Sequence, residues 1–334
     1  MGEASLPVGQ CLPYLTRARA PLTQQVLAVN ESGQSVAVSI PAERALTVYV
    51  DKRELVTLMT LGARPELLVL GFLRNQRLLR SVQEVESITV DWDVGAAAVK
   101  TRHGIADIEA RTAKRVVTTG CGQGSVFGDM MAEVGSLVLP AATLSQAQLY
   151  AIVNAIRLQE STYKSAGSVH GCALFQGQQM LLFVEDVGRH NAIDTIAGWM
   201  WLQNDAPTLA TSPASAVADD ASAALDRPLP EAAALSPEGA VPGLGRPGAA
   251  AGMSGHDKVF YTTGRLTSEM IVKSAQMGVP IVVSRSGITQ MGHQVAERLG
   301  LCAIGRAMNK RFLCYAGSGR LQLQPELVSA ASPI

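Results

Sequence analysis

Cys121 is the residue whose surroundings best suit covalent chemistry. Gly120, Gly122, Gly124 and Gly128 surround it. Glycine permits backbone conformations that other residues resist, so a loop of this composition leaves a thiol mobile and accessible. Thiolate character would also need a positive neighbour or a helix N-terminus, and the sequence shows neither. The residues alone therefore leave a reactive thiol and a structural loop cysteine as equal alternatives.

The segment EDVGRHNAID, residues 185–194, collects acidic, basic and amide side chains between an apolar run and the start of a helix. A turn from strand to helix points backbone N–H groups outward, where an anion can bind. Arg189 could grip phosphate, and His190 could move a proton near neutral pH. The alternative is a helix N-cap with a satisfied cluster of ion pairs. The density of polar side-chain types favours a binding site.

Two further segments suggest an anion site. Thr263, Gly264 and Arg265 follow an apolar run and precede a helix, and Ser286-Gly287 occupies the same place one unit later. Open α/β sheets bind ligands at the carboxyl ends of their parallel strands, so these two turns predict a site for nucleotide phosphates.

A basic segment comes directly after the last predicted parallel strand. Its members are Arg306, Ala307, Met308, Asn309, Lys310 and Arg311. Such a charge run either covers a solvated edge or binds a polyanion.

The strand-end turns and the basic segment at 306–311 belong to a part of the chain in which strands alternate with helices. The apolar runs at 258–263, 280–285 and 301–305 enclose helical segments at 266–277 and 289–299. A glycine follows each helix, as expected at a helix C-terminus. This order predicts a parallel sheet with crossover helices.

The earlier part of the chain is richer in strands. Short apolar runs over residues 35–60, separated by Pro41 and a charged pair, predict an antiparallel meander. A helix opened by Pro65 follows, and residues 87–102 and 172–185 each predict a hairpin. Ser145 and Gln148 form a capping box at the start of a further helix.

Composition narrows the class of protein. Hydrophobic residues make up 47% of the 334 residues, and Lys plus Arg equals Asp plus Glu at 28 each, so no general field attracts nucleic acid. No apolar run is long enough to span a membrane, and the N-terminus lacks the pattern of a secretory signal. Five scattered cysteines without C-x-x-C spacing indicate a reducing compartment, so we expect a cytoplasmic protein.

Residues 204–256 differ from the rest of the chain. They are rich in Ala, Pro, Ser and Gly and contain no aromatic residue. Such a segment buries too little apolar surface to offset the entropy of ordering it, so we expect a disordered insertion that acts as a linker.

Three segments taken together resemble the FdhD family of formate dehydrogenase accessory sulfurtransferases. They are SVHGCALF with LLFVEDVGRHNAIDTIAGW, then YTTGRLTSEMIVKSAQMGVPIVVSRSG, then GLCAIGRAMNKRFLCYAG. The similarity runs from residue 35 to residue 317, apart from the 204–256 insertion.

The resemblance implies both a fold and a function. The fold would be a mixed α/β core related to cytidine deaminases, with an N-terminal antiparallel β part, in a homodimer. Cys121 would accept persulfide sulfur from a cysteine desulfurase and pass it to the molybdenum bis(guanine dinucleotide) cofactor for formate dehydrogenase. The cofactor is then a bound substrate, and no intrinsic metal is expected. By position, its guanine nucleotide falls on Arg306–Arg311, and this basic segment together with Arg265 and Arg189 is the hypothetical binding site for its phosphates. Thr263, Gly264 and His190 complete the expected cofactor-binding residues.

The resemblance and the change in composition together predict how the chain is organised. It comprises a flexible tail over 1–30, a β-rich part over 31–130, an α/β core over 131–203 and 257–320, the insertion over 204–256, and a tail over 321–334.

The sequence departs from the family pattern at one position and leaves rival functions open. Many members carry C-x-x-C in the loop, whereas Gly124 stands at the second position here. A cofactor chaperone without sulfur transfer is therefore the main alternative. A zinc deaminase would need H-x-E and C-x-x-C, but His170 is followed by Gly171 and Cys172. A Cys/His hydrolase lacks an oxyanion-hole signature.

Overall fold

A six-stranded mixed sheet organises the computed structural model, which describes residues 12–109, 134–204 and 254–328. The strand order is β10-β9-β11-β12-β13-β14. Its parallel part consists of β11 (Lys258–Thr262), β12 (Ile281–Ser284) and β13 (Cys302–Met308), connected by α7 (Ser268–Gln276) and α8 (Gln290–Leu299). Gly278 and Gly300, just beyond the two helices, both have positive φ. The predicted strand–helix alternation is confirmed.

Antiparallel strands extend this sheet on both sides. They are β9 (His170–Gln176), β10 (Gln179–Asp186) and β14 (Arg311–Ala316). The β9–β10 pair is the hairpin predicted over residues 172–185. Strand β9 also pairs antiparallel with β11, and β14 returns antiparallel to β13, neither of which the sequence predicted.

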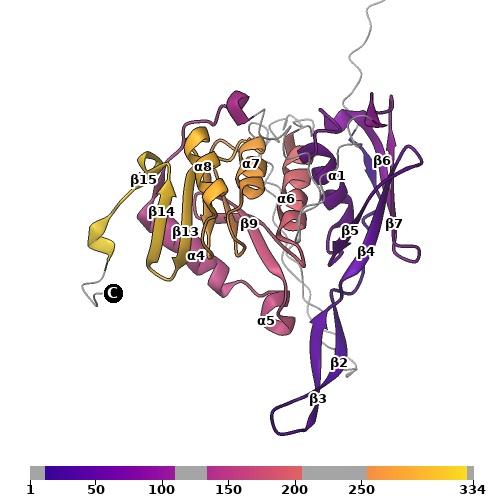
Figure 1. The fold of residues 1–334 in the computed structure, drawn as a ribbon, viewed down its shortest axis with the longest axis horizontal. Helices are drawn as coiled ribbons and strands as arrows, with labels where there is room; N and C mark the ends of the chain where they lie inside the picture. Colours follow the sequence, from indigo (N-terminus) through magenta and orange to yellow (C-terminus); the bar gives the residue numbers. More distant parts are fainter. Residues whose placement is uncertain (1–11, 110–133, 205–253, 329–334) are drawn as a thin grey trace, which may run out of the picture. The chain divides into compact units, whose positions relative to one another are not determined.

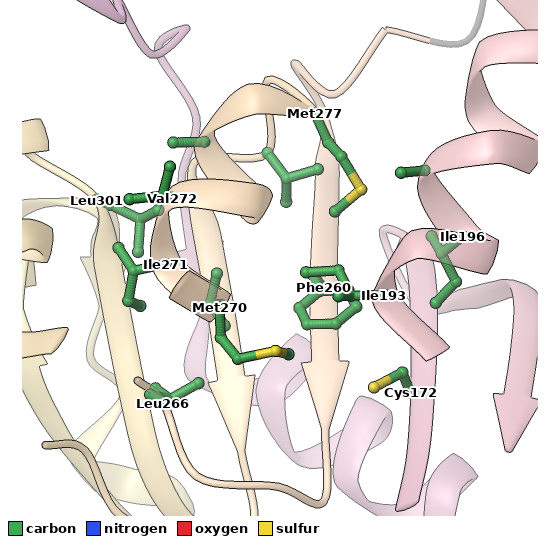
Figure 2. Packing of buried hydrophobic residues seen from close by; sticks show 14 of the residues in the cluster. Cys172, Ile193, Ile196, Phe260, Leu266, Met270, Ile271, Val272, Met277 and Leu301 are labelled. Atoms are coloured by element: carbon green, nitrogen blue, oxygen red, sulfur yellow. The ribbon is translucent and has the colours of Figure 1, made fainter. Parts of the chain in front are cut away.

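Helices cover both faces of the six-stranded sheet. Helices α6 (Arg189–Asn204), α7 and α8 lie on one face, and α4 (Gln146–Leu158) covers the other (Figure 1). Side chains along β11 alternate between the faces: Phe260 packs beside Ile193 of α6 (Figure 2), whereas Val259 packs on the α4 side. The capping box at the start of α4 forms as predicted.

A five-stranded sheet in the order β1-β6-β7-β4-β5 makes up the N-terminal part. Its strands are β1 (Tyr14–Leu15), β4 (Arg44–Val50), β5 (Arg53–Thr60), β6 (Val85–Asp91) and β7 (Ala96–Thr101), and α1 (Pro65–Asn75) packs in the same hydrophobic cluster. The helix opened by Pro65 and the β6–β7 hairpin are confirmed. However, β4 pairs parallel with β7, so this sheet is mixed rather than antiparallel.

The antiparallel meander predicted over residues 35–60 is wrong in one pairing. Strand β3 (Ser35–Pro41) pairs with β2 (Thr23–Val29) in a separate two-stranded sheet and not with β4. Because β5 and β7 occupy both edges of β4, no edge remains for β3.

The chain ends also differ from the tails that the sequence predicted over 1–30 and 321–334. Strands β1 and β2 lie within residues 1–30. Strand β15 (Leu321–Gln322) lies within residues 321–334 and pairs with β8 (Leu144–Ser145). The remaining short elements are α5 (Thr162–Ala166) and the 3-10 helices η1 (Val82–Glu84), η2 (Val134–Ser136), η3 (Ser318–Arg320) and η4 (Pro325–Leu327). Most of the predicted insertion lies outside the described residues. Among the helices of the described ranges, none has the length and apolar character needed to cross a bilayer.

Two glycines allow α1 and α6 to pack in close backbone contact. A Cβ atom on Gly71 of α1 would lie 1.7 Å from the carbonyl oxygen of Asp194. A Cβ atom on Gly198 of α6 would lie 2.1 Å from the carbonyl oxygen of Leu67. Backbone is the obstacle in both cases, so a larger residue can be accommodated only by moving one helix.

A buried charge cluster, consisting of His190, Asp194, Glu269 and Lys273, joins α6 to α7. Lys273 Nζ lies 2.9 Å from Asp194 Oδ2 and 3.4 Å from Glu269 Oε1, and His190 Nε2 lies 3.2 Å from Glu269 Oε2. Asn75 of α1 donates to Asp194 Oδ1 at 2.6 Å. The side chains of Asp194 and Lys273 are completely buried.

Burial and the charges of the neighbouring groups together set the pKa values in this cluster. Burial raises the pKa of Asp194. Burial acts to lower the pKa of Lys273, but the charges of Asp194 and Glu269 outweigh this effect, so the pKa is raised. Both shifts favour the protonated forms: burial penalises the Asp194 carboxylate, and the two neighbouring carboxylates stabilise the Lys273 ammonium group.

We predict that Gly198→Ala lowers the free energy of unfolding by about 3 kcal/mol or more, because the added methyl group must displace α1. Urea unfolding monitored by circular dichroism measures the change in the free energy of unfolding. Gly319→Ala is the matched control, since a Cβ atom there meets nothing within 4 Å. Equal unfolding midpoints for the two variants would refute the close contact.

We predict that Lys273→Met costs about 3–5 kcal/mol of stability at pH 8, because it leaves two buried carboxylates without their counter-charge. In this variant the folded-state pKa of Asp194 lies still further above the unfolded value. The folded state then binds more protons than the unfolded state, so the deficit shrinks as the pH falls from 8 toward 5.

Urea midpoints measured across that pH range test the Lys273 prediction. The double variant Lys273→Met/Asp194→Asn should recover part of the loss, because it removes one of the two uncompensated charges. A deficit that does not vary with pH and is not reduced in the double variant would contradict an electrostatic origin.

Candidate functional site

Strand ends from several elements meet along one side of the six-stranded sheet. Because β9 runs antiparallel to β11 and β10, its first residues lie beside their last ones: Thr262 is opposite Cys172, and Asp186 is opposite His170. The parallel strands β12 and β13 end on the same side. We call this side the strand-end edge, made of residues 170–171, 186–189, 262–265, 284–287 and 306.

Two buried hydroxyl groups hold the turns of the strand-end edge in place. Thr262 Oγ1 accepts a hydrogen bond from the Gly264 amide at 3.0 Å. Ser284 Oγ donates to the Gly264 carbonyl at 2.7 Å and accepts from the Ser286 amide at 2.9 Å. The turn after β11 is thereby fixed to the turn after β12, which gives a preorganised backbone surface at the site predicted for phosphates.

The structure brings Arg189 against the turn that carries Arg265. A Cβ atom on Gly264 would lie 2.8 Å from Arg189 Cδ, so glycine is what allows this side chain to cross the turn. Arg265 itself is exposed. Two of the arginines predicted to bind phosphate, which are far apart in the sequence, therefore lie at the same turn.

His170, which the sequence did not assign to the site, also belongs to this group. Burial lowers its pKa most, and the charges of Arg189 and Arg265 lower it further. The neutral imidazole, which can donate and accept hydrogen bonds, is therefore favoured beside the two guanidinium groups. The only sequence signal for this was its position at the start of a strand whose neighbour was unknown.

The basic segment 306–311 is divided by a hairpin and does not simply follow the last strand. The β13–β14 register shifts between Gly305 and Met308, and Arg306 has φ of 50°, so a bulge lies here. The Arg306 amide donates to the Ser286 carbonyl at 2.8 Å, which places this residue at the strand-end edge.

The rest of the basic segment lies further along the hairpin. Ala307 is buried in the hydrophobic cluster on the α4 side, and Met308 pairs with Arg311. The Lys310 carbonyl accepts a hydrogen bond from Tyr150 of α4 at 3.0 Å. Met308, Asn309, Lys310 and Arg311 are all exposed.

Most polar residues of EDVGRHNAID serve as structural anchors, as in the alternative interpretation of this segment. Asp186 Oδ2 accepts from the Thr60 hydroxyl at 2.5 Å and the Leu61 amide at 3.1 Å. Asn191 Nδ2 donates to Asp186 Oδ1 and to the Met59 carbonyl, both at 2.7 Å. Burial raises the pKa of Asp186 against these hydrogen bonds. The end of β5 is thus tied to the start of α6.

His190 lies with these anchors. Its side chain is only 2% exposed and belongs to the buried charge cluster. The carboxylate of Glu185 accepts hydrogen bonds from the Thr162 and Tyr163 amides at the start of α5. Arg189 is therefore the member of the motif that the geometry groups with the predicted phosphate-binding residues. The sequence did not single out Thr60, Asn75, Glu269 or Lys273, whose partners are distant in the chain.

Cys121 lies outside the described residues, so its position stays a prediction. Three other thiols are described. Cys172 is buried, and burial raises its pKa to about 12. Cys302 is also buried, and its hydrogen bond with Cys314 raises its pKa. The same hydrogen bond lowers the pKa of Cys314, which is half-buried, to about 7.

Two hollows lie apart from the strand-end edge. One, of about 340 Å³, is lined by residues that include Gln176, His256 and Lys258, at the opposite ends of β9 and β11. Another, of about 500 Å³, is lined by residues that include Arg74 and Trp201. Neither contains a residue predicted for the site, and we place the site at the strand-end edge because the arginines and fixed turns converge there.

Comparison with known proteins supports a single family. The model of the FdhD/NarQ family matches residues 41–212 and 248–322. The sulfur carrier protein FdhD of Bacillus subtilis (strain 168) is 27% identical over 281 residues, which are 84% of this chain and 89% of that protein. The protein of the same name from Listeria monocytogenes serotype 4b (strain F2365) is 25% identical over 291 residues, covering 86% and 93%.

A solved structure shares the fold. It is described as a formate dehydrogenase accessory protein from Desulfotalea psychrophila, and it superposes with a TM-score of 0.61 at 20% identity. The match covers 90% of this chain and all of that one. Because the family model matches residues 41–212 and 248–322, which are well over half of the chain, the chain belongs to the FdhD/NarQ family.

Proposed function

We propose that this protein is a sulfur carrier that takes persulfide sulfur onto Cys121 from a cysteine desulfurase. It then passes the sulfur to the molybdenum bis(guanine dinucleotide) cofactor, which formate dehydrogenase needs. The names of the relatives support the sulfur-carrying role, and the name of the related structure supports the link to formate dehydrogenase. A reducing, cytoplasmic setting, a homodimer and kinship with cytidine deaminases complete the proposal.

The observation that carries the proposal is the convergence of arginines at the strand-end edge. Arg189 crosses the turn that carries Arg265, and Arg306 joins the neighbouring turn through its amide. A guanidinium group forms paired hydrogen bonds with phosphate, and backbone fixed by Thr262 and Ser284 loses little entropy on binding. The edge therefore suits the phosphate groups of a guanine dinucleotide.

The uptake step has simple chemistry. The Cys121 thiolate attacks the terminal sulfur of the donor's persulfide, the donor S–S bond breaks, and the donor cysteine leaves as a thiolate. One nucleophilic sulfur is enough for this step, so the glycine at position 124 does not prevent it. The described thiols Cys172 and Cys302 suit this role poorly, because they are buried and their pKa values are raised.

We predict that incubation with a desulfurase and cysteine adds one sulfur, about 32 Da, to Cys121, and that reductant reverses the addition. Intact mass spectrometry with peptide mapping measures the adduct. Cys121→Ser should lose it. Cys314→Ser is the matched control, because Cys314 has the lowest pKa of the described thiols and is the natural competitor.

An adduct that is kept in Cys121→Ser and lost in Cys314→Ser would overturn the assignment to Cys121. If neither variant nor the parent takes up sulfur but all bind the nucleotide, the alternative of a non-catalytic cofactor chaperone is favoured. The absent second loop cysteine is the observation that makes this alternative specific.

We predict that Arg265→Gln weakens binding of GDP, the probe for the nucleotide end of the cofactor, by about tenfold, because a charge-assisted contact to phosphate is lost. Isothermal titration calorimetry at two salt concentrations measures the affinity and its salt dependence. Arg157→Gln on α4 is the matched control, since this exposed arginine lies outside the strand-end edge. Equal affinities for the two variants would exclude Arg265 from the phosphate site.

A further inference from the structure

Cys302 and Cys314 form a pair of thiols on neighbouring strands. They lie on β13 and β14, with the two Sγ atoms 4.0 Å apart and hydrogen-bonded. Cys314 is cross-strand partner to Ile304, two residues beyond Cys302. A disulfide needs the sulfurs at about 2.05 Å, so the two sulfur atoms must approach by roughly 2 Å before they can bond.

The two thiols are not equivalent. Cys302 is completely buried, whereas Cys314 is half-buried next to Leu313, which is 48% exposed, on the edge strand of the sheet. In its thiol form Cys314 also donates to the Ala316 carbonyl at 3.3 Å. An external reagent therefore meets Cys314 first, and Cys302 can only react with what Cys314 presents to it.

The hydrogen bond between the sulfurs assigns their roles in the same order. The Cys302 thiol stabilises the Cys314 thiolate, which lowers the pKa of Cys314 to about 7 and raises the pKa of Cys302. A thiol pKa close to ambient pH gives the best balance between thiolate fraction and intrinsic nucleophilicity.

We infer that Cys302 and Cys314 form a reactive dithiol that takes sulfur electrophiles of the disulfide class, with Cys314 as the attacking thiol and Cys302 as the resolving thiol. In the first step the Cys314 thiolate attacks a small disulfide, whose S–S bond breaks and releases one thiolate. In the second step Cys302 loses its proton and attacks the Cys314 sulfur, which releases the second thiolate. The protein dithiol is oxidised to a disulfide, and the reagent is reduced to two thiols.

This dithiol is separate from the sulfur carrier function. The test therefore uses the full chain with Cys11→Ser and Cys121→Ser, so that Cys172, Cys302 and Cys314 are the only cysteines left. Failure of this inference then says nothing about Cys121. The probe is glutathione disulfide, and intact mass with peptide mapping follows the products.

The expected products differ between variants. The parent of this background should lose two hydrogens, link Cys302 to Cys314 and retain no glutathione. Cys302→Ala should hold one glutathione on Cys314, because nothing resolves it. Cys314→Ser should react at least about tenfold more slowly, since the remaining thiols are buried. Cys172→Ser, the matched control, should behave like the parent.

The pH dependence and the folding controls sharpen the test. The rate at which Cys314 reacts with glutathione disulfide increases with pH, and in Cys302→Ala this increase should occur at a higher pH than in the parent. The reason is that the hydrogen bond that stabilises the Cys314 thiolate is gone. Circular dichroism checks that each variant is folded, and Ala keeps position 302 apolar. Glutathione attached to Cys302 in Cys314→Ser at the parent rate, or a folded parent whose dithiol does not react, would overturn the inference.

Discussion

Helix α6 is enclosed on two sides, and this constraint accounts for much of the structure. It packs on the six-stranded sheet through residues such as Ile193, and it contacts α1 so closely that Gly198 meets the backbone of Leu67. A helix enclosed in this way has no solvated face for polar residues at its start. Its polar side chains must find partners inside the protein, because an unpaired buried charge costs several kcal/mol. Asp194, paired with Lys273 and Asn75, is the result.

The same constraint explains why EDVGRHNAID resembles a catalytic motif. A dense mixture of acids, bases and amides is required both for a site and for a buried polar junction. Asp186 and Asn191 tie the end of β5 to α6, and His190 joins Glu269 of α7. What separates Arg189 from these neighbours is its contact with Gly264, a residue 75 positions later in the sequence. The roles within the motif therefore depend on tertiary contacts.

How much the sequence predicts depends on the range of the interaction that forms each element. The β11–α7–β12–α8–β13 unit was predictable, because apolar runs, helix periodicity and stop glycines are local signals. The pairing of β3 with β2 was not, because it depends on β7 already occupying the free edge of β4. In the site, Thr263, Gly264 and Arg265 were predictable as strand-end residues. His170 was not, because its place beside them depends on β9 running antiparallel to β11.

Charge at the strand-end edge is local and does not reflect the whole chain. Acidic and basic residues balance at 28 each, so no general field draws a polyanion to the protein. Burial lowers the pKa of His170, and the charges of Arg189 and Arg265 lower it further. A site built this way selects its ligand by the geometry of fixed turns rather than by net charge. The function proposed above divides its tasks accordingly: anion binding is assigned to the strand-end edge, and sulfur transfer is assigned to Cys121.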